Sequence, residues 1–173
     1  PRAERLLDLE FGYQFEHKYI NLGVNFYYMW YKDQLVLTGE QNPDTYEALY
    51  MNVPESYRRG IELTVSSEPL SWLKISANAT FSQNKILDYT EYVYNDDTYA
   101  TDAFYIGEST IAYSPSIIAG IALDFHTNGF TGVWRTQYVS KQYITNGMNE
   151  NLTIDPYCVS SVDLSYKLEL KKC

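Results

Sequence analysis

The most constraining feature of this sequence is a hydrophobic pattern with a period of two residues, which continues along most of the chain. In residues 20–30, for example, every even-numbered residue is apolar or aromatic, whereas Asn21, Gly23 and Asn25 lie between them. Successive side chains of a β-strand point to opposite faces, so this alternation predicts strands with one apolar face and one more polar face. Seven such strands are predicted, in residues 7–15, 20–30, 57–67, 72–82, 116–125, 130–143 and 162–170.

The connections between these segments alternate between short and long. Residues 16–18, 68–71 and 126–129 are short, and the last two contain the turn formers Pro69, Asn128 and Gly129. Residues 39–56, 88–115 and 146–156 are long and rich in Asn, Asp, Thr, Gly, Pro and Tyr. In an antiparallel meander, alternate connections emerge at opposite ends of the sheet. The sequence therefore predicts an all-β meander with tight turns at one end and long loops at the other.

Strand length separates two all-β architectures, a soluble sandwich and a membrane barrel. In a sandwich, turns recur about every 8–12 residues. In this chain each predicted strand with its connection takes about 25 residues. Residues 20–30 span about 33 Å when extended, and a tilt of about 40° reduces this to roughly 25 Å, the height of the apolar band of outer-membrane barrels. We expect a transmembrane barrel, with the soluble sandwich as the alternative.

Composition and rare residues limit the possible functions. The formal charge of −9 argues against a nucleic-acid partner, because phosphate contacts require an excess of Lys and Arg. His17 and His126 fall in different predicted turns, and the chain has no phosphate-binding glycine loop, so we expect no metal site, no cofactor and no enzymatic activity. Cys158 and Cys173 are separated by roughly 50 Å if the segment between them is one strand, so both are predicted to be free thiols.

Several loose motifs, in a fixed order, resemble the β-barrel of TonB-dependent outer-membrane receptors. They are Tyr28-Met29-Trp30-Tyr31-Lys32-Asp33, Asn52-Val53, Tyr57-Arg58-Arg59-Gly60-Ile61-Glu62, the opening Glu4-Arg5 with Glu10-x-Gly12-Tyr13, and residues 69–84. The resemblance extends over nearly the whole chain. It implies that residues 1–173 are part of a 22-stranded transmembrane barrel, and that a plug domain and the closing strands lie outside this sequence.

The same resemblance implies a location and partners. It places the protein in the outer membrane, with the long loops outside the cell and the tight turns in the periplasm. The expected partners are outer-membrane lipid, a small chelate or nutrient ligand, and the TonB energy-coupling protein, which would act through the missing N-terminal part.

Candidate ligand-binding residues come from one loop and from the polar face. Residues 88–106 are acidic and rich in tyrosine, and aromatic rings there can stack on a ligand. The alternation places Arg58 and Arg135 on the polar face, where their positive charges are suited to an anionic chelate. Pairing of these arginines with Glu62 or Asp163 is the simpler interpretation. The predicted ligand-binding residues are Arg58, Tyr89, Tyr92, Tyr94, Tyr99, Tyr105 and Arg135. A solvated acidic loop, or a calcium site using Asp96, Asp97 and Asp102, are the alternatives for this segment.

These observations give a functional hypothesis. We expect an outer-membrane TonB-dependent receptor that imports a ferric siderophore or a similar metal chelate. An importer of glycans or vitamins with the same architecture, and a structural or adhesive barrel without transport, are the alternatives.

Overall fold

The structure is a computed structural model that describes residues 2–41, 45–95, 98 and 100–168. In this part of the chain every regular element is a β-strand, and no helix has the length and apolarity needed to cross a membrane. The strands are β1 (Arg5–His17), β2 (Ile20–Gln41), β3 (Ala48–Leu70), β4 (Leu73–Asn95), β5 (Ala100–Thr110), β6 (Ile117–Thr127), β7 (Phe130–Val139), β8 (Gln142–Tyr143), β9 (Thr153–Ile154) and β10 (Tyr157–Tyr166).

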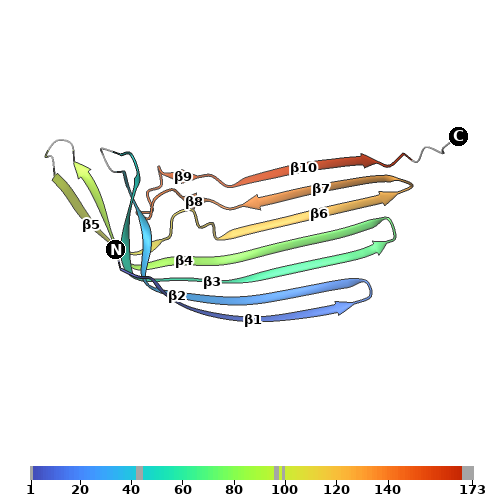
Figure 1. Cartoon of the computed structure of the whole chain (residues 1–173), viewed down its shortest axis with the longest axis horizontal. Coiled ribbons are helices and arrows are strands. Elements are labelled where there is room, and N and C mark those ends of the chain that lie inside the picture. Colours follow the sequence, from blue (N-terminus) through green and yellow to red (C-terminus); the bar gives the residue numbers. More distant parts are fainter. Residues whose placement is uncertain (1, 42–44, 96–97, 99, 169–173) are drawn as a thin grey trace.

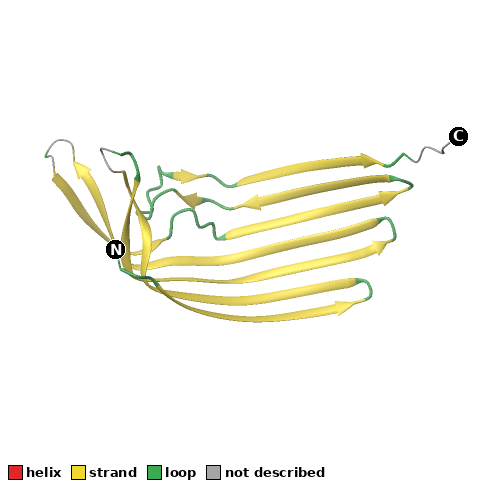
Figure 2. Ribbon diagram, viewed as in Figure 1, coloured by secondary structure: helices red, strands yellow, loops and turns green. Residues whose placement is uncertain are grey.

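One antiparallel sheet contains most of these strands, in the order β1-β2-β3-β4-β6-β7-β10 (Figures 1 and 2). The seven predicted strands correspond to these seven, so the predicted meander is confirmed. β5 pairs with the C-terminal half of β4, and β8 and β9 form a separate two-stranded ribbon. Within the described residues β1 and β10 do not pair with each other, so the sheet is open.

Tight turns join the strands at one end of the sheet, on the right of Figure 1, and the long connections lie at the other end. Asn128 and Gly129 both have positive φ, 41° and 83°, as required in a two-residue hairpin turn with the twist of the sheet. The turn predicted at residues 68–71 is shorter, because β3 continues to Leu70 and β4 begins at Leu73.

The register of the sheet places the apolar residues of all seven strands on one face. Phe26, for example, pairs with Phe11 on one side and with Ile61 on the other. The same parity continues to β10, where Val162 is opposite Trp134. These side chains are exposed, 70% for Phe11 and 63% for Val162. Soluble monomers rarely expose a contiguous apolar surface that extends over seven strands.

The strands extend further than the alternation predicted. Much of residues 39–56 and 88–115, predicted as loops, is strand, because β2, β3 and β4 are each 22 or 23 residues long. In contrast, the strand predicted at 130–143 ends at Val139, where the Ser140 hydroxyl accepts a hydrogen bond from the Ile117 backbone N–H. At the C-terminal end β10 stops at Tyr166 rather than at residue 170, which lies outside the described residues.

The alternation in β2 is reset at Asp33. Asp33 has φ 57°, a left-handed conformation that interrupts the pleat of β2. Beyond it, the Gln34 side chain accepts a hydrogen bond from the hydroxyl of Ser56, which belongs to the polar face. Even-numbered residues of β2 therefore change faces at this point. The period of two continues, but with the opposite phase.

A small hydrophobic core lies beyond this point, at the loop end of the sheet. It consists of the buried residues Val36, Val53, Ile86, Tyr89 and Ile111, with Met51 and Ile106 packed against them. These residues hold β2, β3 and the β4–β5 hairpin together at the loop end of the sheet. This core provides a fixed support for the connections that follow.

Candidate functional site at the loop end of the polar face

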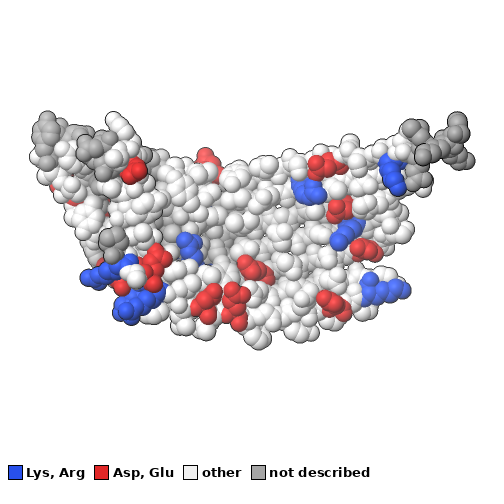
Figure 3. All heavy atoms as spheres, viewed as in Figure 1, with Lys and Arg blue, Asp and Glu red and all other residues white. Residues whose placement is uncertain are grey.

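The face opposite the apolar one carries a network of polar side chains. Asn25 on β2 donates hydrogen bonds to Glu10 on β1, at 3.5 Å, and to Glu62 on β3, at 3.3 Å. Figure 3 shows acidic and basic side chains interleaved along the strands on the face that is turned toward the viewer. This face has the chemistry of a wall in contact with water rather than of a packed core.

Arg58 borders a cavity of about 400 Å³ on this face, near the loop end. Its guanidinium Nη1 donates to the hydroxyl of Ser114 at 3.0 Å and to the amide oxygen of Asn84 at 3.4 Å. Both acceptors are neutral, and among the described residues Arg58 forms no ion pair. The expected pairing with Glu62 is therefore not present in this structure. Arg58 keeps a positive charge next to the cavity, in a fixed position.

Arg135 lies in different surroundings. It borders a second cavity, of about 390 Å³, between β4, β6, β7 and β10. Its guanidinium is paired with the carboxylate of Asp163 on β10, the simpler interpretation of the sequence. The structure thus places the two predicted arginines at separate cavities, and only Arg135 is neutralised by a carboxylate.

The predicted tyrosines fall into two groups. Tyr89 is 0% exposed, lies in the loop-end core and donates a hydrogen bond to the Thr38 carbonyl, so its ring is not presented to a ligand. Tyr92 and Tyr94 on β4 and Tyr105 on β5 are exposed. Tyr105 is opposite Thr90, which has the parity of Tyr92 and Tyr94, so these three rings share one face of the β4–β5 hairpin.

Some residues named in the sequence analysis lie outside the described part of the chain. They are Tyr99, Asp96, Asp97 and Cys173. Asp102, the third residue of the alternative calcium site, accepts a hydrogen bond from the Asn95 side-chain amide at 3.1 Å. No group of three metal-ligating side chains occurs among the described residues. Cys158 has a free and exposed thiol.

The sequence analysis missed the segment that covers the Arg58 cavity. β5 and β6 pair with successive stretches of the same edge of β4, and residues 111–116 between them leave the sheet. The carbonyl of Pro115 accepts a hydrogen bond from the Ser82 hydroxyl, and Tyr113 and Ser114 border the cavity together with Arg58. The only signal in the sequence is the turn-forming string Tyr113-Ser114-Pro115-Ser116.

Hydrogen bonds hold the connection between β7 and β10 against the loop end of the sheet. Asn146 is 1% exposed, and its side-chain amide donates to the Leu37 carbonyl at 2.7 Å. Its side-chain oxygen accepts from the Ala112 backbone N–H, also at 2.7 Å. One residue thus ties this connection both to β2 and to the segment that covers the Arg58 cavity.

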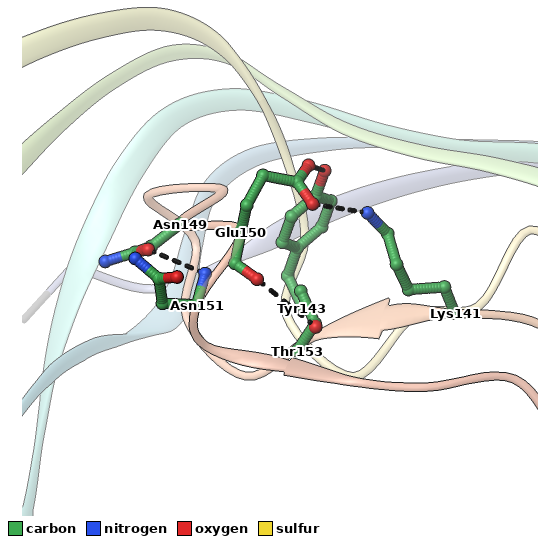
Figure 4. A network of polar contacts seen from close by, with 6 residues as sticks. All are labelled: Lys141, Tyr143, Asn149, Glu150, Asn151 and Thr153. Atoms are coloured by element: carbon green, nitrogen blue, oxygen red, sulfur yellow. Dashed lines mark hydrogen bonds and ion pairs between the residues drawn. The ribbon is translucent and has the colours of Figure 1, made fainter.

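A second group of contacts lies further along this connection (Figure 4). The Glu150 carboxylate accepts hydrogen bonds from the Lys141 ammonium at 2.8 Å and from the Tyr143 hydroxyl at 2.7 Å. The hydrogen bonds from Lys141 and then Tyr143 lower the pKa of Glu150, and the hydrogen bond to Glu150 raises the pKa of Lys141. These charges lie outside the strands that carry the apolar face.

Comparison with known proteins gives a consistent result. Residues 2–172 match the family described as TonB dependent receptor-like, beta-barrel. No sequence among curated proteins matches the chain significantly. Similar solved structures include the ferric yersiniabactin uptake receptor FyuA from Yersinia pestis, with a TM-score of 0.66 and 16% identity over 94% of this chain and 22% of that one.

Two further solved structures have a similar fold. A variant of the ferric enterobactin receptor PfeA from Pseudomonas aeruginosa, in complex with enterobactin, has a TM-score of 0.65 and 19% identity, over 97% of this chain and 24% of that one. The copper transporter OprC has a TM-score of 0.66 and 14% identity, over 96% of this chain and 23% of that one. The chain therefore spans about a quarter of the length of these structures, and the similarity at such identities concerns the fold alone.

Proposed function

The chain belongs to the TonB-dependent receptor-like β-barrel family, and from this premise we propose that it forms part of the wall of an outer-membrane receptor that imports a ferric siderophore or a similar anionic metal chelate. The proposal has three parts, which are the position in the membrane, the energy source and the ligand. Each part rests on different observations.

The apolar face supports a position in the outer membrane. Seven strands present exposed apolar side chains in one continuous register, and the opposite face is polar. A membrane barrel needs this arrangement, because one face contacts hydrocarbon and the other faces a hydrated interior. In this proposal the tight turns face the periplasm and the long connections, with the loop-end core, face the cell exterior.

Energy coupling is proposed from family membership alone. Transport would be driven by the TonB protein acting through a segment that is not part of this sequence. The described residues therefore contribute the wall and the outer loops. The part of the mechanism that this chain can supply is ligand capture at the loop end.

The single observation that carries the ligand class is the state of Arg58. Its guanidinium faces a cavity of about 400 Å³ and is held by two neutral acceptors rather than by a carboxylate. Glu10 and Glu62 border the same cavity, but neither forms an ion pair with Arg58, so its guanidinium can attract an anionic ligand without first breaking an ion pair. Tyr92, Tyr94 and Tyr105 on the exposed hairpin supply rings that can stack on the organic part of a chelate.

Arg135 has a secondary role in this proposal. Because Asp163 neutralises it, an anionic ligand gains less from Arg135 than from Arg58. We place Arg135 further along the path of the ligand through the barrel interior, and not at the point where the ligand is first captured. Tyr99, which lies outside the described residues, remains a proposed ligand contact.

Growth of a deletion strain that expresses the full-length receptor tests the transport function. We expect growth on one or more ferric siderophores as the only iron source, and weaker growth at limiting siderophore concentration when Arg58 is replaced by Gln. Growth supported only by copper, glycans or vitamins would contradict the proposed ligand class. Absence of transport for every class of nutrient would indicate a structural or adhesive barrel.

A further inference from the structure

Four basic residues lie on the apolar side of the wall, at its loop end. Arg5 on β1 is directly opposite Lys32 on β2, and both have the parity of the apolar stripe below them. Arg59 on β3 is opposite Tyr28 and continues the stripe that contains Ile61. Lys85 on β4 is opposite Tyr57, on the same face. Ligand capture inside the barrel makes no use of this cluster.

The contacts of Arg59 establish which face it occupies. Its Nε donates to the Gln83 amide oxygen at 2.8 Å, and its guanidinium lies 5.1 Å from the centre of the Tyr57 ring. Tyr57 in turn stacks on Tyr28, with ring centres 6.2 Å apart. Aromatic rings at this level are typical of the boundary between hydrocarbon and headgroups. Arg59 is therefore placed just above that boundary, on the outer surface.

Most of the positive charge in this cluster is not neutralised. Lys85 pairs with Glu108 at 3.3 Å. Glu55 is opposite Lys32 in the register, but among the described residues Arg5, Lys32 and Arg59 form no ion pair. The four cations thus face two carboxylates, which leaves a positive excess. Arg5, Lys32 and Arg59 are also exposed.

An apolar hollow lies on the same face, nearer to the tight turns. It has a volume of about 680 Å³ and is bordered mainly by apolar residues of β1 to β4, among them Phe15, Leu63 and Ala79. Ala77 and Ala79 on β4 are small, whereas the neighbouring residues are bulky, and this difference hollows the surface. Leu63 is four residues from Arg59, about 13 Å along the strand, which is less than the roughly 15 Å of hydrocarbon in one leaflet.

We propose that this surface binds one phosphorylated lipid of the loop-side leaflet. Arg5, Lys32 and Arg59 contact its phosphate groups, and an acyl chain lies in the hollow bordered by Leu63 and Ala79. The positive charge favours an anionic lipid over a zwitterionic phospholipid. Each cation of a basic cluster at a membrane surface raises the affinity for anionic lipid roughly fivefold. This inference rests on the membrane position proposed above and is independent of the transported ligand.

The test uses full-length receptor refolded into phosphatidylcholine vesicles and then extracted in mild detergent. Bis-phosphorylated lipid A is titrated, and the bound fraction is measured by native mass spectrometry. We expect the combined variant R5Q/K32Q/R59Q to lose about a hundredfold in affinity for lipid A, and R59Q alone roughly fivefold. Lys74→Gln is the control, since it removes one positive charge from the opposite face of the wall, where Lys74 on β4 is opposite Asp124, and its lipid A affinity should equal that of the wild type.

Three results would overturn the lipid site while leaving the membrane position intact. They are wild-type affinity in the combined variant, equal affinity for dephosphorylated lipid A, and displacement of lipid A by an equal concentration of inorganic phosphate. If the receptor does not enter the vesicles at all, the membrane position fails, and the lipid site fails with it.

Discussion

Arg58 and Arg59 are adjacent on β3, yet their guanidinium groups lie on opposite faces of the wall. Arg58 donates to Ser114 and Asn84 on the polar face, whereas Arg59 donates to Gln83 and lies over the Tyr57 ring on the apolar face. The pleat of a strand imposes this separation. Two consecutive residues of the same type can therefore have unrelated functions, which we propose to be ligand capture for Arg58 and lipid contact for Arg59.

The first prediction compares the two arginines of the polar face. Arg58→Gln should weaken binding of an anionic ferric chelate by roughly tenfold or more, because a charge-assisted hydrogen bond is lost from a group without a competing carboxylate. Arg135→Gln should have a smaller effect, since Asp163 already neutralises Arg135. Binding is measured by titrating the full-length receptor with the chelate that supports growth. Equal losses for the two variants would contradict the assignment of Arg58 to first capture.

The positions of the strands could be predicted from the sequence because a single physical rule controls them. Apolar side chains must share one face, and a shift of one residue would place a whole strand on the wrong face. The phase reset at Asp33 could not be predicted, because it depends on a left-handed backbone conformation at a residue that also occurs in ordinary strands. Residues 39–56 were predicted as a loop because they are rich in Asn, Asp, Thr, Gly, Pro and Tyr, although β2 and β3 extend into this segment.

The candidate site was only partly accessible from the sequence, because side-chain partners are set by the fold. Tyr89 and Tyr92 belong to the same tyrosine-rich stretch, but an irregular register between Ile86 and Thr90 turns Tyr89 into the core. Likewise, parity alone gives Arg58 and Arg135 the same face and does not show that only Arg135 has a carboxylate partner. Ser114 becomes a partner of Arg58 only when residues 111–116 fold over the sheet.

The second prediction concerns the attachment of the connection between β7 and β10. Asn146→Ala should lower the free energy of local opening of this connection by about 1–3 kcal/mol, since it removes buried hydrogen bonds to Leu37 and Ala112. Hydrogen–deuterium exchange of residues 144–153 measures this opening. Asn149→Ala is the control, because Asn149 is exposed and bonds only locally, to the Asn151 backbone. Faster exchange in the control than in Asn146→Ala would contradict the prediction.

The third prediction is the pH dependence of the same connection. Hydrogen bonds from Lys141 and Tyr143 lower the pKa of Glu150, so the stabilising contact is complete above the ordinary pKa of about 4.3 and is lost as the pH falls through the lowered value. Lys141 has a raised pKa, so its contribution is complete below about 10.4 and is lost only above that. Protection from exchange at residues 150–153 should therefore be constant from about pH 5 to pH 9.

The Glu150→Gln variant provides the control for this pH dependence. It should show weaker protection at neutral pH and no further loss on acidification, because Gln does not titrate. Exchange rates are corrected for their intrinsic dependence on pH. If wild-type protection already fell between pH 7 and pH 6, another titrating group would have to control the connection.

The fourth prediction concerns the close packing of Tyr27 against Gly60. A Cβ placed on Gly60 would lie 2.6 Å from the Tyr27 hydroxyl oxygen and would also clash with the Phe81 carbonyl oxygen. Gly60→Ala should therefore destabilise the folded barrel by about 1–3 kcal/mol, measured by urea unfolding in lipid vesicles. Gly120→Ala is the milder control, since its nearest contact is the Asn78 side-chain oxygen at 3.3 Å. A similar loss at both glycines would argue against a specific role for the Tyr27 contact.

The last prediction tests the membrane position of the apolar face. Val24 lies in the middle of the apolar stripe of β2, between Tyr13 and Leu63. Val24→Arg should cost roughly 2–4 kcal/mol of folding free energy in lipid vesicles, and Tyr28→Arg should cost less because the penalty decreases toward the interface. Asn25→Arg should cost little, since the new cation would lie beside Glu10 and Glu62, which Asn25 already contacts. A buried sandwich core would also penalise Val24→Arg, but such a penalty follows burial rather than depth in a bilayer. Equal penalties at the three positions, or folding of the full-length receptor without lipid or detergent, would rule out the membrane position.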